Sequence, residues 1–67
     1  MVKDLWKRGG QYYTQFSIQP SQFINENKIL FAEGNVIKYI CRHRGKNGRE
    51  DLEKAKHYID MIIERDY

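Results

Sequence analysis

The stretch EGNVIKYICRHRGKNGREDL, residues 33–52, contains the end of one helical pattern, a turn with two glycines and the start of a second helical pattern. At about 100° per residue, four apolar side chains in its first half share one arc of a helix. They are Val36, Ile37, Ile40 and Cys41. The segment GKNG interrupts the pattern, as glycine-rich segments often do. We therefore predict a helix from about Leu30 to Arg44, a turn, and another helix from about Arg49.

The helix predicted from Arg49 has the clearest apolar stripe of the chain, and it continues to near the C-terminus. The stripe consists of Leu52, Ala55, Ile59, Ile62 and Ile63. Asn47 is followed three residues later by Glu50, which is the spacing of a capping box and predicts the start of this helix.

A shorter helix is predicted in PSQFINEN, residues 20–27, because proline suits a first helical turn. We expect Phe23 and Ile24 to face inward. The preceding QYYTQFSI alternates with period two and predicts an extended segment. The expected fold class is all-α, with one domain over residues 1–67. Residues 1–11 form an extended N-terminal aromatic arm, flexible or ordered by a partner, and residues 12–67 form a three-helix core.

The small size of the protein limits its stability. A chain of 67 residues buries only about 60% of the surface that its unfolded form exposes. Its single cysteine, Cys41, permits no internal disulfide and favours a reducing compartment. No run of residues resembles a membrane span or a signal peptide. We therefore expect a cytoplasmic protein without membrane contact, stabilised as a homo-oligomer.

Basic residues are concentrated in one segment of the chain, although the net charge of the protein is small. The net charge is +3, yet every residue charged at pH 7 from Lys38 to Arg49 is basic. The arc of the middle helix opposite the apolar one carries Phe31, Asn35, Lys38, Tyr39 and Arg42. Cations suit phosphate oxygens, an amide suits a base edge or a ribose, and aromatic rings stack on bases. This mixture predicts a nucleotide-binding face, and the alternative is an ordinary solvated helix face.

Three further features leave alternatives open. Lys46 lies in the loop RHRGKNGR, which is either an anion site or a basic turn at the negative end of a helix. Gly34 implies either a close approach by another backbone or by a ligand, or a helix boundary. Glu33 lies on the apolar arc; it is a candidate catalytic or metal-binding acid, but we favour an ion pair across a subunit contact.

No metal site is predicted, because Cys41, His43 and His57 lack zinc-ligand spacing. The aromatic residues of the N-terminal region are expected to pack on the helices or on a neighbouring subunit, with stacking on a bound base as the alternative. These residues are Trp6, Tyr12, Tyr13 and Phe16.

A longer motif links these segments: Tyr13, Ile18-Gln19-Pro20, Phe31-x-x-Gly34-Asn35-x-x-Lys38-Tyr39-x-x-Arg42 and Lys46-x-Gly48-x-x-Asp51-Leu52-x-Lys54-Ala55-x-x-Tyr58. It resembles the small phage-encoded SaV-like family, a family without assigned function. The P-loop-free nucleotide kinase of certain podoviruses is similar in a related domain. The resemblance implies a helical protein of viral or prophage origin, acting in an infected cell. It implies ligand-site roles for Asn35, Lys38, Tyr39, Arg42, Asp51 and Lys54. Tyr13 is a further candidate ligand-binding residue, as one of the aromatic residues that could stack on a bound base. Members often have histidine at the position of Tyr12, and the kinase is a much longer chain.

Three functions follow as hypotheses. The first is a non-catalytic module that captures phosphate-bearing nucleotides at the basic helix face and a subunit interface. Cyclic di- or trinucleotide defence signals are one candidate ligand, and no cofactor is then needed. The second is a P-loop-free nucleoside monophosphate kinase, which would require Mg²⁺. The third is a helical DNA-binding protein, which the mixed character of the basic face disfavours. Glu33 or Asp51 would hold the magnesium in the second case.

Overall fold

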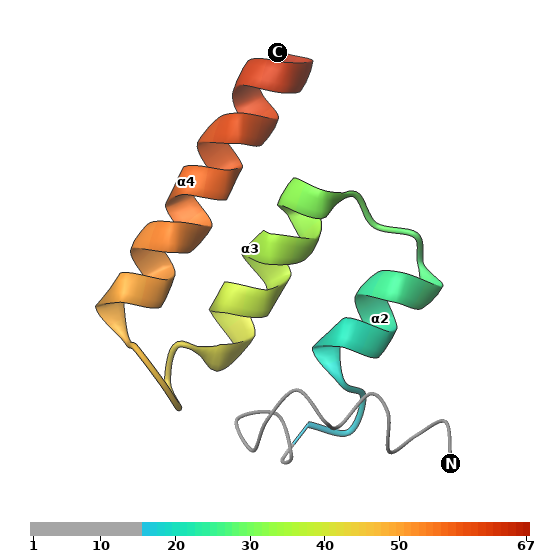
Figure 1. Cartoon of the computed structure of the whole chain (residues 1–67), viewed down its shortest axis with the longest axis vertical. Coiled ribbons are helices and arrows are strands. Elements are labelled where there is room, and N and C mark those ends of the chain that lie inside the picture. Colours follow the sequence, from blue (N-terminus) through green and yellow to red (C-terminus); the bar gives the residue numbers. More distant parts are fainter. Residues whose placement is uncertain (1–15) are drawn as a thin grey trace.

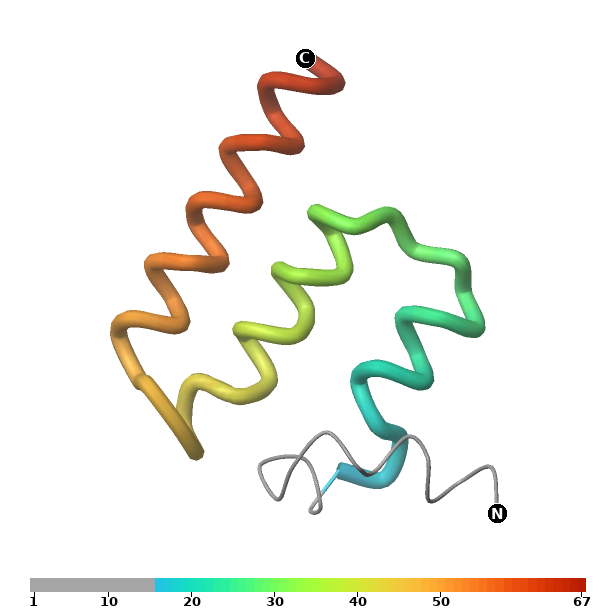
Figure 2. Tube along the Cα trace, in the orientation of Figure 1, coloured from blue at the N-terminus to red at the C-terminus, as the bar shows by residue number. Residues whose placement is uncertain are grey.

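A computed structural model describes residues 16–67, which form three helices and no strand. Helix α2 spans Pro20–Glu26, α3 spans Phe31–Arg42 and α4 spans Arg49–Asp66. They follow one another up, down and up, with α3 between α2 and α4 (Figure 1). The trace in Figure 2 shows that α4 runs antiparallel to α3 and that its C-terminal part extends beyond the first turn of α3. The all-α prediction is confirmed for these residues, whereas the predicted arm at residues 1–11 lies outside them.

Helix α2 ends in a tight motif that shapes the connection to α3. Lys28 has φ of 53°, in the left-handed region that favours glycine. The amide of Lys28 donates to the Asn25 carbonyl at 3.1 Å, and the amide of Ile29 donates to the Ile24 carbonyl at 3.1 Å. These two bonds are those of a Schellman motif, in which apolar residues at the positions of Ile24 and Ile29 often make contact. Pro20 is the first residue of α2, as predicted.

Small residues form the contact between α3 and its neighbours. Ala32 and Ala55 are the buried hydrophobic residues of the described part, with exposures of 6% and 2%, and Gly34 is also buried. The predicted inner arc of α3 is confirmed in part: Val36, Ile37 and Cys41 are half-buried, whereas Ile40 is 47% exposed. The helices approach through small side chains, so the larger aliphatic residues flank the contact instead of filling it.

The apolar stripe of α4 likewise contains both buried and exposed side chains. Ala55 is buried and Ile62 is half-buried, whereas Leu52, Ile59 and Ile63 are exposed. In α2, Ile24 is half-buried as predicted, but Phe23 is 45% exposed and does not face a core.

Two local predictions fail. Helix α4 begins after Gly48 without a side-chain cap, so Asn47 and Glu50 do not form a capping box. The amide group of Asn47 donates to Asp51 instead. Glu33 pairs with Arg65 of the same chain, not across a subunit contact. The hydrogen bonds from Arg65 lower the pKa of the Glu33 carboxyl.

No helix within residues 16–67 combines the length and the apolar character needed to cross a bilayer.

Candidate functional site

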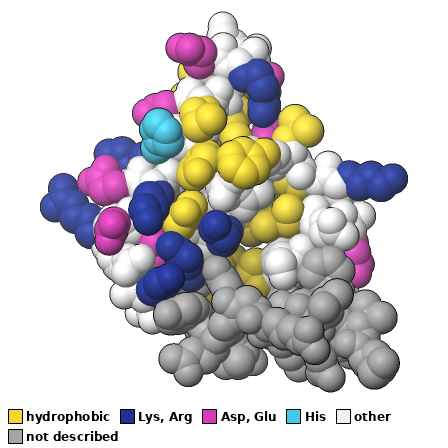
Figure 3. Space-filling model, viewed as in Figure 1, with side chains coloured by type: hydrophobic (Ala, Val, Ile, Leu, Met, Phe, Trp, Pro, Cys, Tyr) yellow, Lys and Arg dark blue, Asp and Glu magenta, His cyan; other side chains and the backbone are white. Residues whose placement is uncertain are grey.

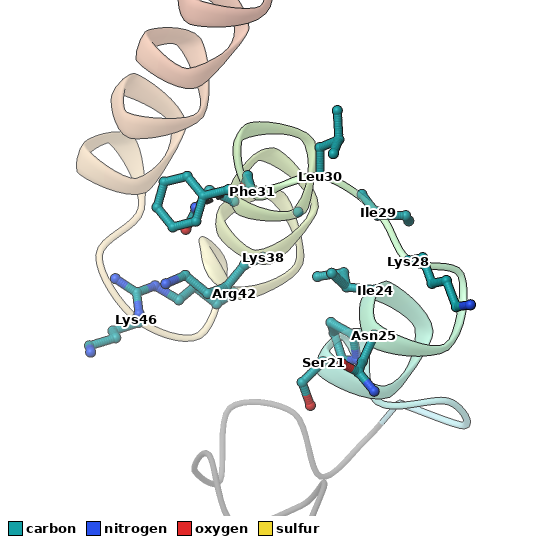
Figure 4. Close-up of a pocket in the computed structure, with 13 residues that line it drawn as sticks. Ser21, Ile24, Asn25, Lys28, Ile29, Leu30, Phe31, Lys38, Arg42 and Lys46 are labelled. Carbon is teal, nitrogen blue, oxygen red and sulfur yellow. Dashed lines mark hydrogen bonds between the residues drawn. The ribbon is translucent and has the colours of Figure 1, made fainter.

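A cleft of about 730 Å³ lies along one side of α3, facing α2. Ile24 and Ile29 line it beside Gly34 of α3, and Phe31 and Leu30 stand at its upper end (Figure 4). At its other end the side chains of Lys38, Arg42 and Lys46 extend from α3 and the loop after it. The cleft thus joins an apolar wall to a cationic end.

Gly34 explains why α2 lies so close to α3. A Cβ atom placed on Gly34 would lie 3.0 Å from Cγ2 of Ile24. A larger residue would therefore push α2 away and change the wall of the cleft. The close neighbour of Gly34 is thus the side chain of Ile24, not a backbone or a ligand, and Gly34 also lies in the first turn of α3.

A second cluster surrounds Tyr39, on the side of α3 nearer to α4. Its ring stacks on Tyr58 of α4, with centroids 5.9 Å apart and an interplanar angle of 12°. The Nζ of Lys38 lies 4.7 Å from the Tyr39 centroid, the Cζ of Arg42 4.6 Å and the Nζ of Lys54 5.4 Å. Cations at such distances are attracted to the ring face. Figure 3 shows basic side chains gathered beside hydrophobic ones over this part of the molecule.

A buried carboxylate fixes Arg42. Asp51 is fully buried and accepts hydrogen bonds from Nε and Nη2 of Arg42, both at 3.2 Å. It also accepts from the backbone amide of Asn47 at 3.3 Å and from its side chain at 3.4 Å. Only 15% of the Arg42 side chain is exposed. The buried Asp51 carboxylate therefore positions the Arg42 guanidinium.

The environment of Asp51 favours its charged form. Burial by itself would raise the pKa of this carboxyl. The hydrogen bonds from Arg42 and Asn47, with the positive charge of Arg42, outweigh burial and lower the pKa. Asp51 therefore stays ionised at neutral pH and holds the Arg42 guanidinium against the Tyr39 ring.

The other predicted site residues are placed as follows. Asn35 lines the cleft, and its amide nitrogen donates one hydrogen to the Phe31 carbonyl at 2.9 Å, which leaves its oxygen and its second N–H to meet a ligand. Lys46 lines the cleft, while Lys54 belongs to the cluster around Tyr39. Tyr13 lies outside the described residues.

Sequence reasoning missed several members of this region. Tyr58 had a detectable signal, since Asp51, Lys54 and Tyr58 follow the three- and four-residue spacing of one helix face. Lys28 and Asn25 had none, because their place beside the cleft depends on how α2 crosses α3. Within residues 16–67, no three His, Cys, Asp or Glu side chains converge as a metal site would require.

The fold and the site define a small helical protein with a basic, aromatic cleft. The family model of a protein of unknown function, DUF3310, matches residues 7–60 of the 67-residue chain. The chain belongs to this family. No curated protein and no solved structure matches it.

Proposed function

We propose that the protein captures phosphate-bearing nucleotides in the cleft between α2 and α3, without catalysis. The observation that carries the proposal is the junction of an apolar wall with a cationic end in one cleft of about 730 Å³. That volume is within the range of small-molecule sites. Ile24 and Phe31 offer apolar surface for a base, and the Asn35 oxygen offers an acceptor for a base edge or a ribose hydroxyl.

The cationic end suits phosphate. Lys38 supplies a compact ammonium, and Arg42 places a planar guanidinium beside it at the same end of the cleft. Because Asp51 and Tyr39 fix the Arg42 side chain, little conformational entropy is lost when an anion binds there.

Self-association through the opposite face completes the proposal. The contact that we propose uses four exposed aliphatic side chains: Ile40 of α3 and Leu52, Ile59 and Ile63, which recur on one side of α4. Ile63 is nine residues from Lys54, about two and a half helical turns, so the two side chains lie on opposite sides of α4. The second copy is the occupant that we propose, because two described residues alone provide the buried hydrophobic core of a single copy.

A two-fold axis would relate the two copies, so that this face of one copy packs against the same face of the other. Each copy would then keep a complete cleft, in contrast to the sequence-based expectation of a ligand at the subunit interface.

The phage resemblance gives this capture a biological setting. A phage protein that binds a nucleotide signal tightly, such as a cyclic di- or trinucleotide, would remove it from a host defence pathway. The alternative function is a P-loop-free nucleotide kinase. It would need a second nucleotide and Mg²⁺, for which Glu33 is unsuited because it pairs with Arg65. DNA binding ranks third, because Tyr39 and Arg42 are held against neighbouring side chains and do not project from the surface.

The test begins with native mass spectrometry of freshly purified protein, which detects co-purified nucleotides. Calorimetry then measures binding of linear and cyclic nucleotides to the parent, to Lys38→Ala and to the control Lys56→Ala. Lys56 is exposed on α4 beside Glu53 and outside the cleft. We expect Lys38→Ala to weaken binding at least tenfold and the control to bind like the parent. Equal binding by all three proteins would show that the cleft is not the site, and conversion of the nucleotide to a phosphorylated product would favour the kinase.

A further inference from the structure

The cations around Tyr39 extend beyond the cleft. Lys38 and Arg42 line the cleft and also approach the Tyr39 ring. Lys54 approaches the same ring from α4 but does not line the cleft. A path of positive charge therefore begins at the cationic end of the cleft and continues over Tyr39 to the neighbouring helix.

The three cations differ in whether a neighbouring carboxylate neutralises their charge. Arg42 is paired with the buried Asp51. For Lys38 and Lys54, no carboxylate oxygen within residues 16–67 lies within 4 Å of the ammonium nitrogen. Two ammonium groups held near one ring repel each other, and an anion between them converts this repulsion into attraction. Two neighbouring ammonium groups therefore attract two linked phosphate groups more strongly than they attract a single phosphate group.

We propose that the ligand carries a linear chain of two or three phosphates, and not the separated phosphodiesters of a cyclic nucleotide, with the first phosphate at Lys38 and Arg42 and the next reaching Lys54. This inference rests on the proposed function, because it requires the nucleoside to occupy the cleft. A nucleoside monophosphate in the cleft ends at Lys38 and Arg42 and makes no contact with Lys54. Lys54 is therefore the residue that distinguishes nucleoside di- and triphosphates from monophosphates.

The experiment varies two factors: the number of phosphates in the ligand and the presence of Lys54 on α4. Calorimetry at fixed ionic strength measures binding of adenosine, guanosine and thymidine mono-, di- and triphosphates and of inorganic tripolyphosphate. The proteins are the parent, Lys54→Gln and Lys56→Gln. Lys56 is a matched control, since it lies two residues away on the same helix and pairs with Glu53 at 3.7 Å. Circular dichroism confirms that each variant is folded.

We expect the parent to bind the triphosphate of the preferred nucleoside at least tenfold more tightly than its monophosphate. Lys54→Gln should weaken binding of the di- and triphosphate about tenfold, the effect of losing one charge-assisted hydrogen bond, and leave monophosphate binding within twofold. Lys56→Gln should change neither.

The outcomes separate the two proposals. Equal affinity for mono-, di- and triphosphate, or an equal loss for all three in Lys54→Gln, would overturn the phosphate-chain inference and leave nucleotide capture standing. Tripolyphosphate that binds as tightly as the best triphosphate would overturn nucleotide capture, because the nucleoside would then contribute nothing.

Discussion

Replacing Asp51 by asparagine tests the central contact of the molecule. The substitution keeps the size of the side chain but removes the charge that opposes Arg42. It also replaces one accepting oxygen by a donating NH₂ group, which then faces a donor from Arg42 or Asn47. Breaking a buried ion pair on one side costs about 3–5 kcal/mol. The Arg42 side chain is 15% exposed and gains some hydration, so we expect a loss of about 2–3 kcal/mol of unfolding free energy.

That loss is large for a chain of 67 residues, whose total stability is on the order of 3–10 kcal/mol. The melting temperature should fall by about 10–20 °C. Urea denaturation at pH 7, followed by far-UV circular dichroism, measures the free energy. Asp60→Asn is the control, because Asp60 is exposed on the same helix and its replacement should cost less than about 0.5 kcal/mol.

A double-mutant cycle identifies the partner. Arg42→Met removes the guanidinium and keeps much of the aliphatic stem that lies against Tyr39. In that background, Asp51→Asn should cost at least 1 kcal/mol less than in the parent, since residues in direct contact couple by about 0.5–3 kcal/mol. An Asp51→Asn protein as stable as the parent, or a coupling energy near zero, would refute the view that this pair holds α3 to the start of α4.

Three more outcomes follow from the structure. Because the pKa of Asp51 is lowered in the folded state, its stabilising effect is complete above its unfolded pKa of about 3.9 and is lost as pH falls through the folded value. The free energy of unfolding should therefore fall between about pH 5 and pH 2, less steeply in Asp51→Asn, and an unchanged slope would contradict this role. Gly34→Ala should stabilise the protein by about 1 kcal/mol in an Ile24→Ala background but not in the parent, where the added methyl meets Ile24; equal effects in both would contradict the close packing. Ile59→Lys should shift sedimentation toward the monomer without changing nucleotide affinity, whereas a parent that is monomeric at all concentrations would exclude the proposed pairing.

The number and approximate limits of the helices could be predicted from sequence, because periodicity and turn residues are local signals. Pro20 and the segment GKNG mark boundaries that the structure keeps within about two residues. The inward-facing arc of α3 was predicted in part, because three of its four residues are half-buried and Ile40 is exposed. Hydrophobic periodicity points to the largest apolar side chains, whereas the buried apolar side chains of α3 and α4 are those of Ala32 and Ala55, which carry little weight in such a pattern.

The candidate site was predictable in composition but not in geometry. The cations and aromatic rings of α3 could be found because they recur on one side of a helix. The choice of Arg42 over Lys38 as the partner of Asp51 depends on the path of a six-residue turn, residues 43–48, which no local pattern determines. The cleft itself depends on how closely α2 approaches α3 at Gly34, which is a property of two segments together.

Some residues of the site serve both the fold and the proposed ligand binding, whereas others serve only the proposed binding. Arg42 and Tyr39 join α3 to α4 through Asp51 and Tyr58, so substituting either one alters the fold and the proposed phosphate site together. Lys38 and Lys54 have no carboxylate partner among residues 16–67, and their mutual repulsion opposes the attraction of each to the Tyr39 ring. Neutralising either lysine should therefore change stability little while weakening nucleotide binding. Nearly unchanged stability together with a loss of affinity is the pattern expected of residues retained for binding.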